Sequence, residues 1–265
     1  MPFHQVDTLR YLTFDLFDQA GIRHAVFTRR GGVSPAPWAS LNVGGLVGDL
    51  PECVTENRRR SFAALGSSLD SLYDVWQVHS AEVVIAEAPR SGAPHHQADA
   101  ILTDHPGVTL YMRFADCTPV LLVDPEHHAV GLVHAGWQGT VKKIAAAAVA
   151  AMQARYGSRP GALLAAIGPS IGPHHYPVGP DVVARVEQAF GSQAPALLEN
   201  PPDRSSGQSG VQFDLWSANR LVLEAAGVRQ IEVSQICTAC HLEDWYSHRG
   251  EQGRTGRFGA LIAVE

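Results

Sequence analysis

The feature that most constrains the fold is a pair of short apolar runs in the stretch between residues 113 and 139. The runs are Pro119–Val123 and Ala129–Val133, and the polar segment Asp124–His128 separates them. Branched apolar runs on either side of an Asp-Pro turn predict the two strands of an antiparallel hairpin. A chain of 265 residues is long enough to bury such strands in a continuous core without disulfide cross-links.

Two chemically reactive side chains lie at the open end of this hairpin. Cys117 comes just before the first run and His134 just after the second. A loop of two or four residues would put them on the same face of the sheet, and a loop of three or five on opposite faces. We expect four residues, with the two Cβ atoms roughly 5–8 Å apart. A thiolate and an imidazole at that spacing form half of a zinc site or a Cys–His nucleophile pair.

Composition narrows the class of protein. Hydrophobic residues make up 45% of the chain and charged residues 17%, which is typical of a globular protein. The formal charge is −6 and no Lys/Arg cluster stands out, which argues against nucleic acid as a partner. Four irregularly spaced cysteines, no signal segment and no apolar run of membrane-spanning length predict a soluble cytoplasmic protein, not associated with a membrane, in a reducing compartment. We expect residues 1–265 to form a single domain.

The pattern of apolar residues predicts further elements on both sides of the hairpin. Glu199–Gly210 is rich in Pro, Gly and Ser, and it predicts a loop that serves as a lid or a surface excursion. The expected strands are Ile22–Thr28, Val75–His79, Val83–Ala86, Ala98–Thr103, Thr109–Phe114, Leu163–Ile167, Ile231–Ile236 and Phe258–Val264. The expected helices are Pro51–Leu65, Thr140–Tyr156, Asp181–Phe190 and Asp214–Ala226.

Polar residues outside the hairpin leave structural and functional interpretations open. Arg29 and Arg30 precede two glycines, so this turn is either an anion cradle or an ordinary solvated turn. Arg58–Arg60 lies late in an expected helix, where cations suit the helix dipole. His79, at the end of an expected strand, is by itself more typical of a hydrogen-bonded structural histidine than of a metal ligand.

Several short motifs, in a fixed order over most of the chain, resemble the YfiH-like, laccase-domain family. This family was once described as multicopper polyphenol oxidases and is now described as purine nucleoside phosphorylases. Each motif alone is weak, and their order makes the resemblance specific. The motifs are FTRRGGVS (27–34), SLNVG (40–44), ENRRR (56–60), QVHSAEV (77–83), ADAILT (98–103), ADCTPVLLVD (115–124), VHAGWQGT (133–140), IGPSIGPHHYPVG (167–179), DLWSANRLVL (214–223), CT (237–238) and YSHRGEQGRTGRF (246–258).

The resemblance implies a fold and a metal site. The implied fold class is α+β, with mixed β-sheets packed as a sandwich and helices on the outer faces. The family's metal ligands fall on His79, Cys117 and His134, which are therefore the expected catalytic residues. Three ligands of this His₂Cys type with an open fourth position are typical of a catalytic zinc site, with copper as the alternative metal.

The resemblance also implies a reaction. It is the phosphorolysis of purine nucleosides (adenosine, inosine, guanosine and methylthioadenosine) to the base and ribose-1-phosphate, with adenosine deamination as a side activity. Deamination requires a water activated by a metal, and phosphorolysis requires arginines or backbone N–H groups to hold phosphate. The candidates for phosphate binding are Arg29, Arg30, Arg58, Arg249, Arg254 and Arg257.

Three other classes of function remain open. A copper-dependent polyphenol oxidase would use the same ligands, but a multicopper enzyme needs roughly ten ligands, many in H-x-H pairs, and this chain has no such pairs. A Cys-dependent amidase in peptidoglycan editing would use Cys117 as nucleophile and a histidine as base. A non-catalytic binding protein is disfavoured, because all three metal ligands of the family are present in this chain.

Some residues depart from the family or match competing motifs. Gln138 stands where the family commonly has Arg, and Tyr176-Pro177 stands where a Glu often follows the aromatic residue. The segment 237–241 matches the haem-attachment pattern C-x-x-C-H, which would require export, and it also allows a redox pair. The pair His174-His175 replaces Cys-Cys of some family members. Like the pairs at 95–96 and 127–128, it could bind metal, but a polar surface turn is favoured.

Overall fold

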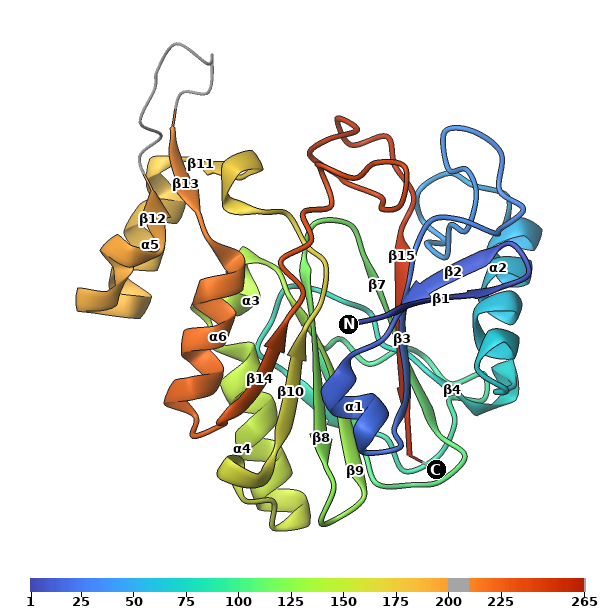
Figure 1. Cartoon of the computed structure of the whole chain (residues 1–265), viewed down its shortest axis with the longest axis horizontal. Helices are drawn as coiled ribbons and strands as arrows, with labels where there is room; N and C mark the ends of the chain where they lie inside the picture. Colours follow the sequence, from blue (N-terminus) through green and yellow to red (C-terminus); the bar gives the residue numbers. More distant parts are fainter. Residues whose placement is uncertain (200–209, 265) are drawn as a thin grey trace.

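Two six-stranded sheets form the framework of the computed structural model, which describes residues 1–199 and 210–264 (Figure 1). The first sheet has the order β1 (Phe3–Val6), β2 (Leu9–Leu12), β3 (Arg23–Phe27), β15 (Phe258–Ala263), β7 (Thr109–Phe114) and β4 (Leu72–Tyr73). The second has the order β14 (Gln230–Val233), β10 (Leu164–Ile167), β8 (Thr118–Asp124), β9 (Ala129–Ala135), β6 (Ala100–Thr103) and β5 (Val83–Ile85). A small sheet joins β11 (Pro177–Val178), β13 (Val211–Phe213) and β12 (Leu198–Glu199).

The hairpin β8–β9 lies in the middle of the second sheet and is buried on both faces. Along β8, Val120 and Leu122 belong to one apolar cluster, while Leu121 and Val123 belong to another. The second of these clusters also contains residues of the first sheet, such as Met112, so it fills the space between the two sheets. Burial on both faces explains why these strands are continuous apolar runs without polar alternation.

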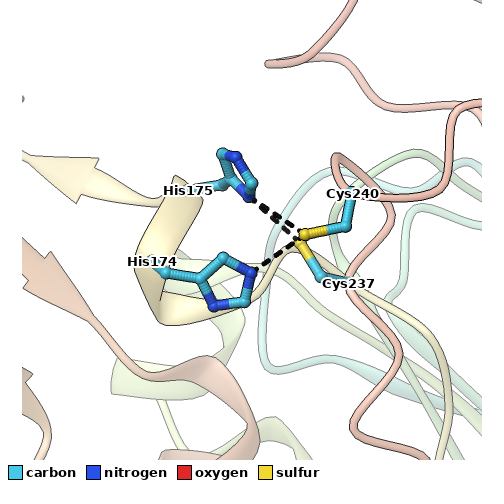
Figure 2. Close-up of side chains that lie close together, drawn as sticks. All are labelled: His174, His175, Cys237 and Cys240. Carbon is cyan, nitrogen blue, oxygen red and sulfur yellow. Dashed lines mark hydrogen bonds between the residues drawn. The ribbon is translucent and has the colours of Figure 1, made fainter.

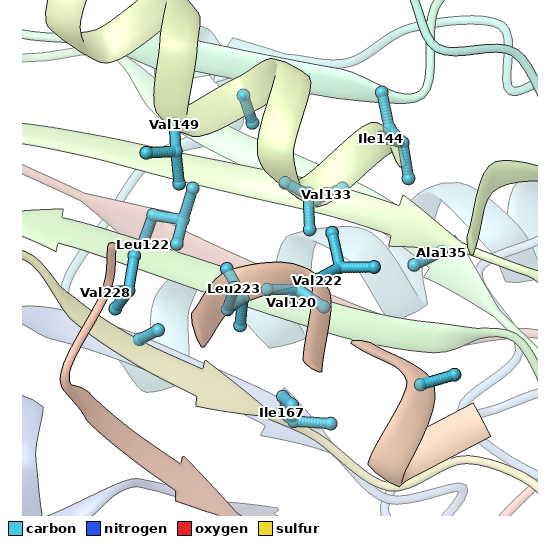
Figure 3. Close-up of a cluster of buried hydrophobic side chains, with 14 of the residues drawn as sticks. Val120, Leu122, Val133, Ala135, Ile144, Val149, Ile167, Val222, Leu223 and Val228 are labelled. Atoms are coloured by element: carbon cyan, nitrogen blue, oxygen red, sulfur yellow. The ribbon is translucent and has the colours of Figure 1, made fainter. Parts of the chain in front are cut away.

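Helices cover the outer faces of both sheets. α4 (Ile144–Tyr156) and α6 (Leu215–Ala225) pack on the second sheet, and Figure 3 shows side chains from both helices meeting Val120, Leu122 and Val133. On the first sheet, Phe62 of α2 (Pro51–Ala64) contacts the ring of Tyr111, with 5.3 Å between centroids. The other α-helices are α1 (Asp15–Gln19), α3 (Trp137–Val141) and α5 (Pro180–Phe190). The predicted sandwich with helices outside is therefore confirmed.

Most predicted elements occur within a few residues of their expected bounds, and the differences have local causes. The helix expected over Thr140–Tyr156 is interrupted at Lys143, whose φ of +62° separates α3 from α4. Val75–His79 is not a strand and makes a single bridge at Trp76. The strands β1 and β2 and the helix α1 were not predicted from the short N-terminal patterns.

Two expectations concern parts of the chain outside these elements. The predicted loop Glu199–Gly210 lies outside the described residues except at its two ends. Within residues 1–199 and 210–264, none of the helices has the length and hydropathy needed to cross a bilayer.

Candidate metal centre

The register of the hairpin decides how Cys117 and His134 face each other. Asp124 pairs with Ala129, so the connecting loop has four residues, as predicted. Pro119 pairs with His134, which places Cys117 diagonally across from His134 at the open end of the hairpin. The two side chains therefore lie on the same face, as the parity argument required.

His79 joins this pair from the connection between β4 and β5. Its backbone has a φ of +58°, and Lys142 Nζ donates a hydrogen bond of 2.6 Å to its carbonyl oxygen. His79 Nε2 lies 3.8 Å from Cys117 Sγ, and its ring centroid is 5.0 Å from that of His134. One ligand atom from each of the three residues lies within 4.8 Å of the other two, so the structure brings the three predicted residues together.

Asp99 orients the histidines of the centre through hydrogen bonds, and it was not predicted as a site residue. Its Oδ1 accepts a hydrogen bond of 2.8 Å from His134 Nδ1, which leaves Nε2 as the free ring nitrogen of His134. Its Oδ2 accepts from the backbone N and side-chain hydroxyl of Ser80, next to His79, at 2.6 and 2.8 Å. One fully buried carboxylate thus orients His134 directly and fixes the backbone that carries His79.

The electrostatics of the centre favour a thiolate. Burial raises the pKa of Cys117, but the positive charge and hydrogen bonds of His134 and His79 lower it to about 6. Burial lowers the pKa of His134, whereas the Cys117 thiolate and the Asp99 carboxylate raise it to about 9. Cys117 and His134 therefore form a thiolate–imidazolium pair near neutral pH when no cation is bound.

Gly136 allows the three side chains to approach one another. A Cβ atom at this position would lie 2.7 Å from Cys117 Sγ, closer than real Cβ contacts, and 3.0 Å from His79 Cδ2, which is tighter than most of them. Any larger residue here would push into the space between the thiol and the imidazole. The close packing of the centre therefore requires a glycine at this position of the motif HAGW.

The donor set fits a soft or borderline metal ion. A thiolate and two neutral imidazoles are ligands for zinc or copper, and the Asp99 hydrogen bond to His134 is the outer contact that metal-binding histidines usually make. Three protein ligands would leave a fourth position for a reactant. The assignment of His79, Cys117 and His134 as metal ligands stays a prediction.

Five of the candidate arginines donate hydrogen bonds from their guanidinium groups to acceptors within the protein, Arg249 to Pro177 O and Arg257 to Thr255 O and Gly256 O among them. Arg29 contacts Ala39 O, Leu242 O and Glu251, and it lies over the Tyr246 ring. Arg30 pairs with Asp244, and Arg58 donates from Nε and Nη2 to Val43 O. Arg29 and Arg30 connect their glycine-rich turn to the segment 242–251, and Arg58 connects α2 to the backbone at Val43. These contacts have a structural role.

Arg249 and Arg257 lie nearer the centre. Burial lowers the pKa of Arg257, while the negative charges of Cys117 and Asp116 oppose that shift, so these groups are close enough to interact. The backbone N of Arg249 donates to Asp116 at 2.7 Å, and its guanidinium lies over the Tyr176 ring. Both arginines thus lie near Asp116, the residue before Cys117, and Arg257 also interacts with the thiol. The structure shows no comparable contact for Arg254 within residues 1–199 and 210–264.

Comparison with known proteins supplies the family. Residues 23–265 match the family described as multi-copper polyphenol oxidoreductase laccase. The chain is 41% identical over 243 residues to a purine nucleoside phosphorylase of Deinococcus radiodurans, which covers 92% of this chain and 89% of that one. It is 38% identical over 252 residues to purine nucleoside phosphorylase YlmD of Geobacillus stearothermophilus, covering 92% and 90% of the two chains.

Solved structures agree with this similarity. The crystal structure of YlmD from Geobacillus stearothermophilus matches with a TM-score of 0.90 at 35% identity, over 99% of this chain and 98% of that one. The crystal structure of the hypothetical protein YfiH of Bacillus licheniformis also gives 0.90, at 31% identity, over 100% and 99% of the chains.

Proposed function

This chain belongs to the laccase-domain family, and we propose that it is a purine nucleoside phosphorylase acting at the centre of His79, Cys117 and His134. The similarity over 92% of the chain to a purine nucleoside phosphorylase carries this proposal. The proposed reaction joins phosphate to C1′ of adenosine, inosine, guanosine or methylthioadenosine. The C1′–N bond breaks, and the base leaves with its electron pair and takes up a proton.

We propose zinc as the metal. A zinc ion held by the three side chains would supply Lewis acidity and lower the pKa of water, which is the chemistry that a side activity of adenosine deamination requires. The protein itself orients the imidazole: Asp99 keeps the proton on Nδ1 of His134 and so directs Nε2 toward Cys117. Dependence on a thiolate supports a reducing, cytoplasmic location.

Arg249 and Arg257 are the proposed phosphate-binding residues. The support is the hydrogen bond from Arg249 N to Asp116 and the charge interaction of Arg257 with Cys117 and Asp116. The guanidinium groups of Arg29 and Arg30 instead pair with the carboxylates of Glu251 and Asp244, which favours a structural role for those two. A guanidinium pairs with two phosphate oxygens at once, a geometry that lysine does not reproduce. Replacement of Arg257 by Lys should therefore raise the KM for phosphate more than it lowers kcat.

Product analysis tests the proposed reaction. Adenosine, inosine, guanosine and methylthioadenosine are incubated with and without phosphate, and bases and ribose-1-phosphate are separated by chromatography. We expect free base only with phosphate for the wild type, a loss of turnover and of the zinc ion at this centre for Cys117→Ala, and no change for the control Cys53→Ala. If no base forms with phosphate, or if Cys117→Ala retains full turnover, the proposal fails.

A second candidate is the Cys-dependent amidase, because Cys117, His134 and Asp99 have the arrangement of a nucleophile, its base and an orienting carboxylate. In that case Cys117→Ser would lose activity on peptide amides but keep its metal content. Chelation would leave the wild-type rate unchanged. The copper oxidase alternative predicts phenol oxidation and stoichiometric copper in protein purified without added copper.

A further inference from the structure

A second group of metal-binding side chains lies outside the centre described above. His174 and His175 come from a short 3₁₀ turn, Pro173–His175, and Cys237 and Cys240 come from the loop after β14 (Figure 2). One ligand atom from each residue lies within 4.8 Å of the other three. The two halves are 62 to 66 residues apart in the sequence, so the fold itself brings them together.

We propose that these four residues bind a second, structural zinc ion with Cys₂His₂ ligation. Two thiolates and two imidazoles complete a tetrahedral shell and leave no position for a reactant, which distinguishes this group from the three-residue centre. The two negative charges of the thiolates balance the charge of the ion. This assignment does not depend on the proposed reaction.

Three sulfur–nitrogen distances in this group are close to those of a tetrahedron around zinc. Bonds of about 2.3 Å to sulfur and about 2.0 Å to nitrogen put neighbouring S and N ligands about 3.5 Å apart. His174 Nε2 lies 3.1 Å from Cys240 Sγ, and His175 Nδ1 lies 3.4 Å from Cys240 Sγ and 3.6 Å from Cys237 Sγ. Because the adjacent histidines use different ring nitrogens, both rings reach one point from neighbouring positions.

The residue Gly172 allows the histidines and the cysteines to come close together. Gly172 N donates a hydrogen bond of 3.2 Å to Cys237 Sγ, a contact that stabilises a thiolate. A Cβ atom on Gly172 would lie 2.7 Å from His174 Cε1 and 3.2 Å from Cys237 Cβ, so a side chain here would separate the two halves. Cys237 is buried whereas Cys240 is exposed, and all four cysteines of the chain are free thiols.

Metal content is the direct test. Protein from zinc-supplemented cultures, purified with a reductant and without chelators, is analysed by native mass spectrometry and elemental analysis. We expect two zinc ions per chain in the wild type and in the matched control Cys53→Ser. We expect one in Cys240→Ser, one in Cys117→Ser, and none in the double variant. A single zinc in the wild type that Cys240→Ser retains would overturn the proposal.

A second measurement on the wild type does not depend on whether a variant folds. Iodoacetamide labelling, mapped by peptide mass, is compared before and after removal of zinc by a chelator. We expect exposed Cys240 to be protected only while zinc is bound, and Cys53 to react at the same rate in both states. Equal labelling of Cys240 in both states, or a Cys237–Cys240 disulfide in the purified protein, would refute the second site.

Discussion

Replacing Asp99 by Asn should weaken metal binding at the three-residue centre without removing a ligand. Asn keeps the shape of the side chain but loses the charge that His134 Nδ1 and the Ser80 amide contact at 2.8 and 2.6 Å. Loss of such an outer contact typically costs roughly 10- to 100-fold in metal affinity, or about 1.4 to 2.7 kcal/mol. Competition with a chromophoric chelator measures this change.

The same substitution has a separate effect on the stability of the metal-free protein. Burial raises the pKa of Asp99, but hydrogen bonds from His134 and Ser80 outweigh it and lower the pKa from 3.8 to about 2. At 1.36 kcal/mol per pKa unit, the charged form contributes roughly 2 kcal/mol at neutral pH. Because the folded-state pKa is depressed, this contribution is present above about pH 4 and is lost as the pH falls toward 2. Urea unfolding at several pH values should show the difference shrinking in acid.

Asp124 provides a matched control at the other end of the same hairpin. It is also buried, and its carboxylate accepts a hydrogen bond of 2.8 Å from His127 Nδ1. Asp124→Asn should lower the free energy of unfolding but leave zinc affinity unchanged. Wild-type zinc affinity in Asp99→Asn, or an equal loss in both variants, would show that Asp99 does not act on the centre through His134.

Two further predictions follow from the same geometry. Gly136→Ala should reduce metal content and turnover, because its Cβ would lie 2.7 Å from Cys117 Sγ, and overpacking of this kind costs about 1–3 kcal/mol; an unchanged zinc content by elemental analysis would contradict it. In metal-free protein, the rate of Cys117 alkylation should be near its plateau above pH 7 and half of it at about pH 6, because its pKa is lowered to about 6. The rate at Cys53, whose pKa is raised, should still increase through pH 9, and parallel pH profiles for the two thiols would refute the thiolate–imidazolium pair.

The sequence predicted best what depends on local pattern and strand parity. The runs that became β8 and β9 are apolar on both faces because each face meets a different core, and the four-residue loop fixed the common face of Cys117 and His134. The break at Lys143 was missed because alanine-rich helical propensity dominates that stretch, and nothing local marks a left-handed residue there.

The residues around the centre were less predictable, because their roles depend on tertiary contacts. His79 is 38 residues from Cys117 in the sequence and became a candidate only through the family resemblance. Asp99 could have been noticed as an acidic residue at the start of the apolar run that became β6, where full burial demands a partner. The arginines are equivalent in the sequence pattern, and only tertiary contacts separate Arg29, which pairs with Glu251, from Arg257, which interacts with the charges of Cys117 and Asp116.

The two groups of histidines and cysteines are connected through Asp116, the residue before Cys117. Asp116 is buried with a φ of +78°, and its carboxylate accepts hydrogen bonds of 2.7 Å from Thr238 Oγ1 and from Arg249 N. Thr238 follows Cys237, so the loop that the second zinc would hold also holds the backbone that positions Cys117. A substitution in either group can therefore lower activity through the same contacts. For this reason activity alone does not identify a ligand, whereas the number of bound metal ions assigns each side chain to its own centre.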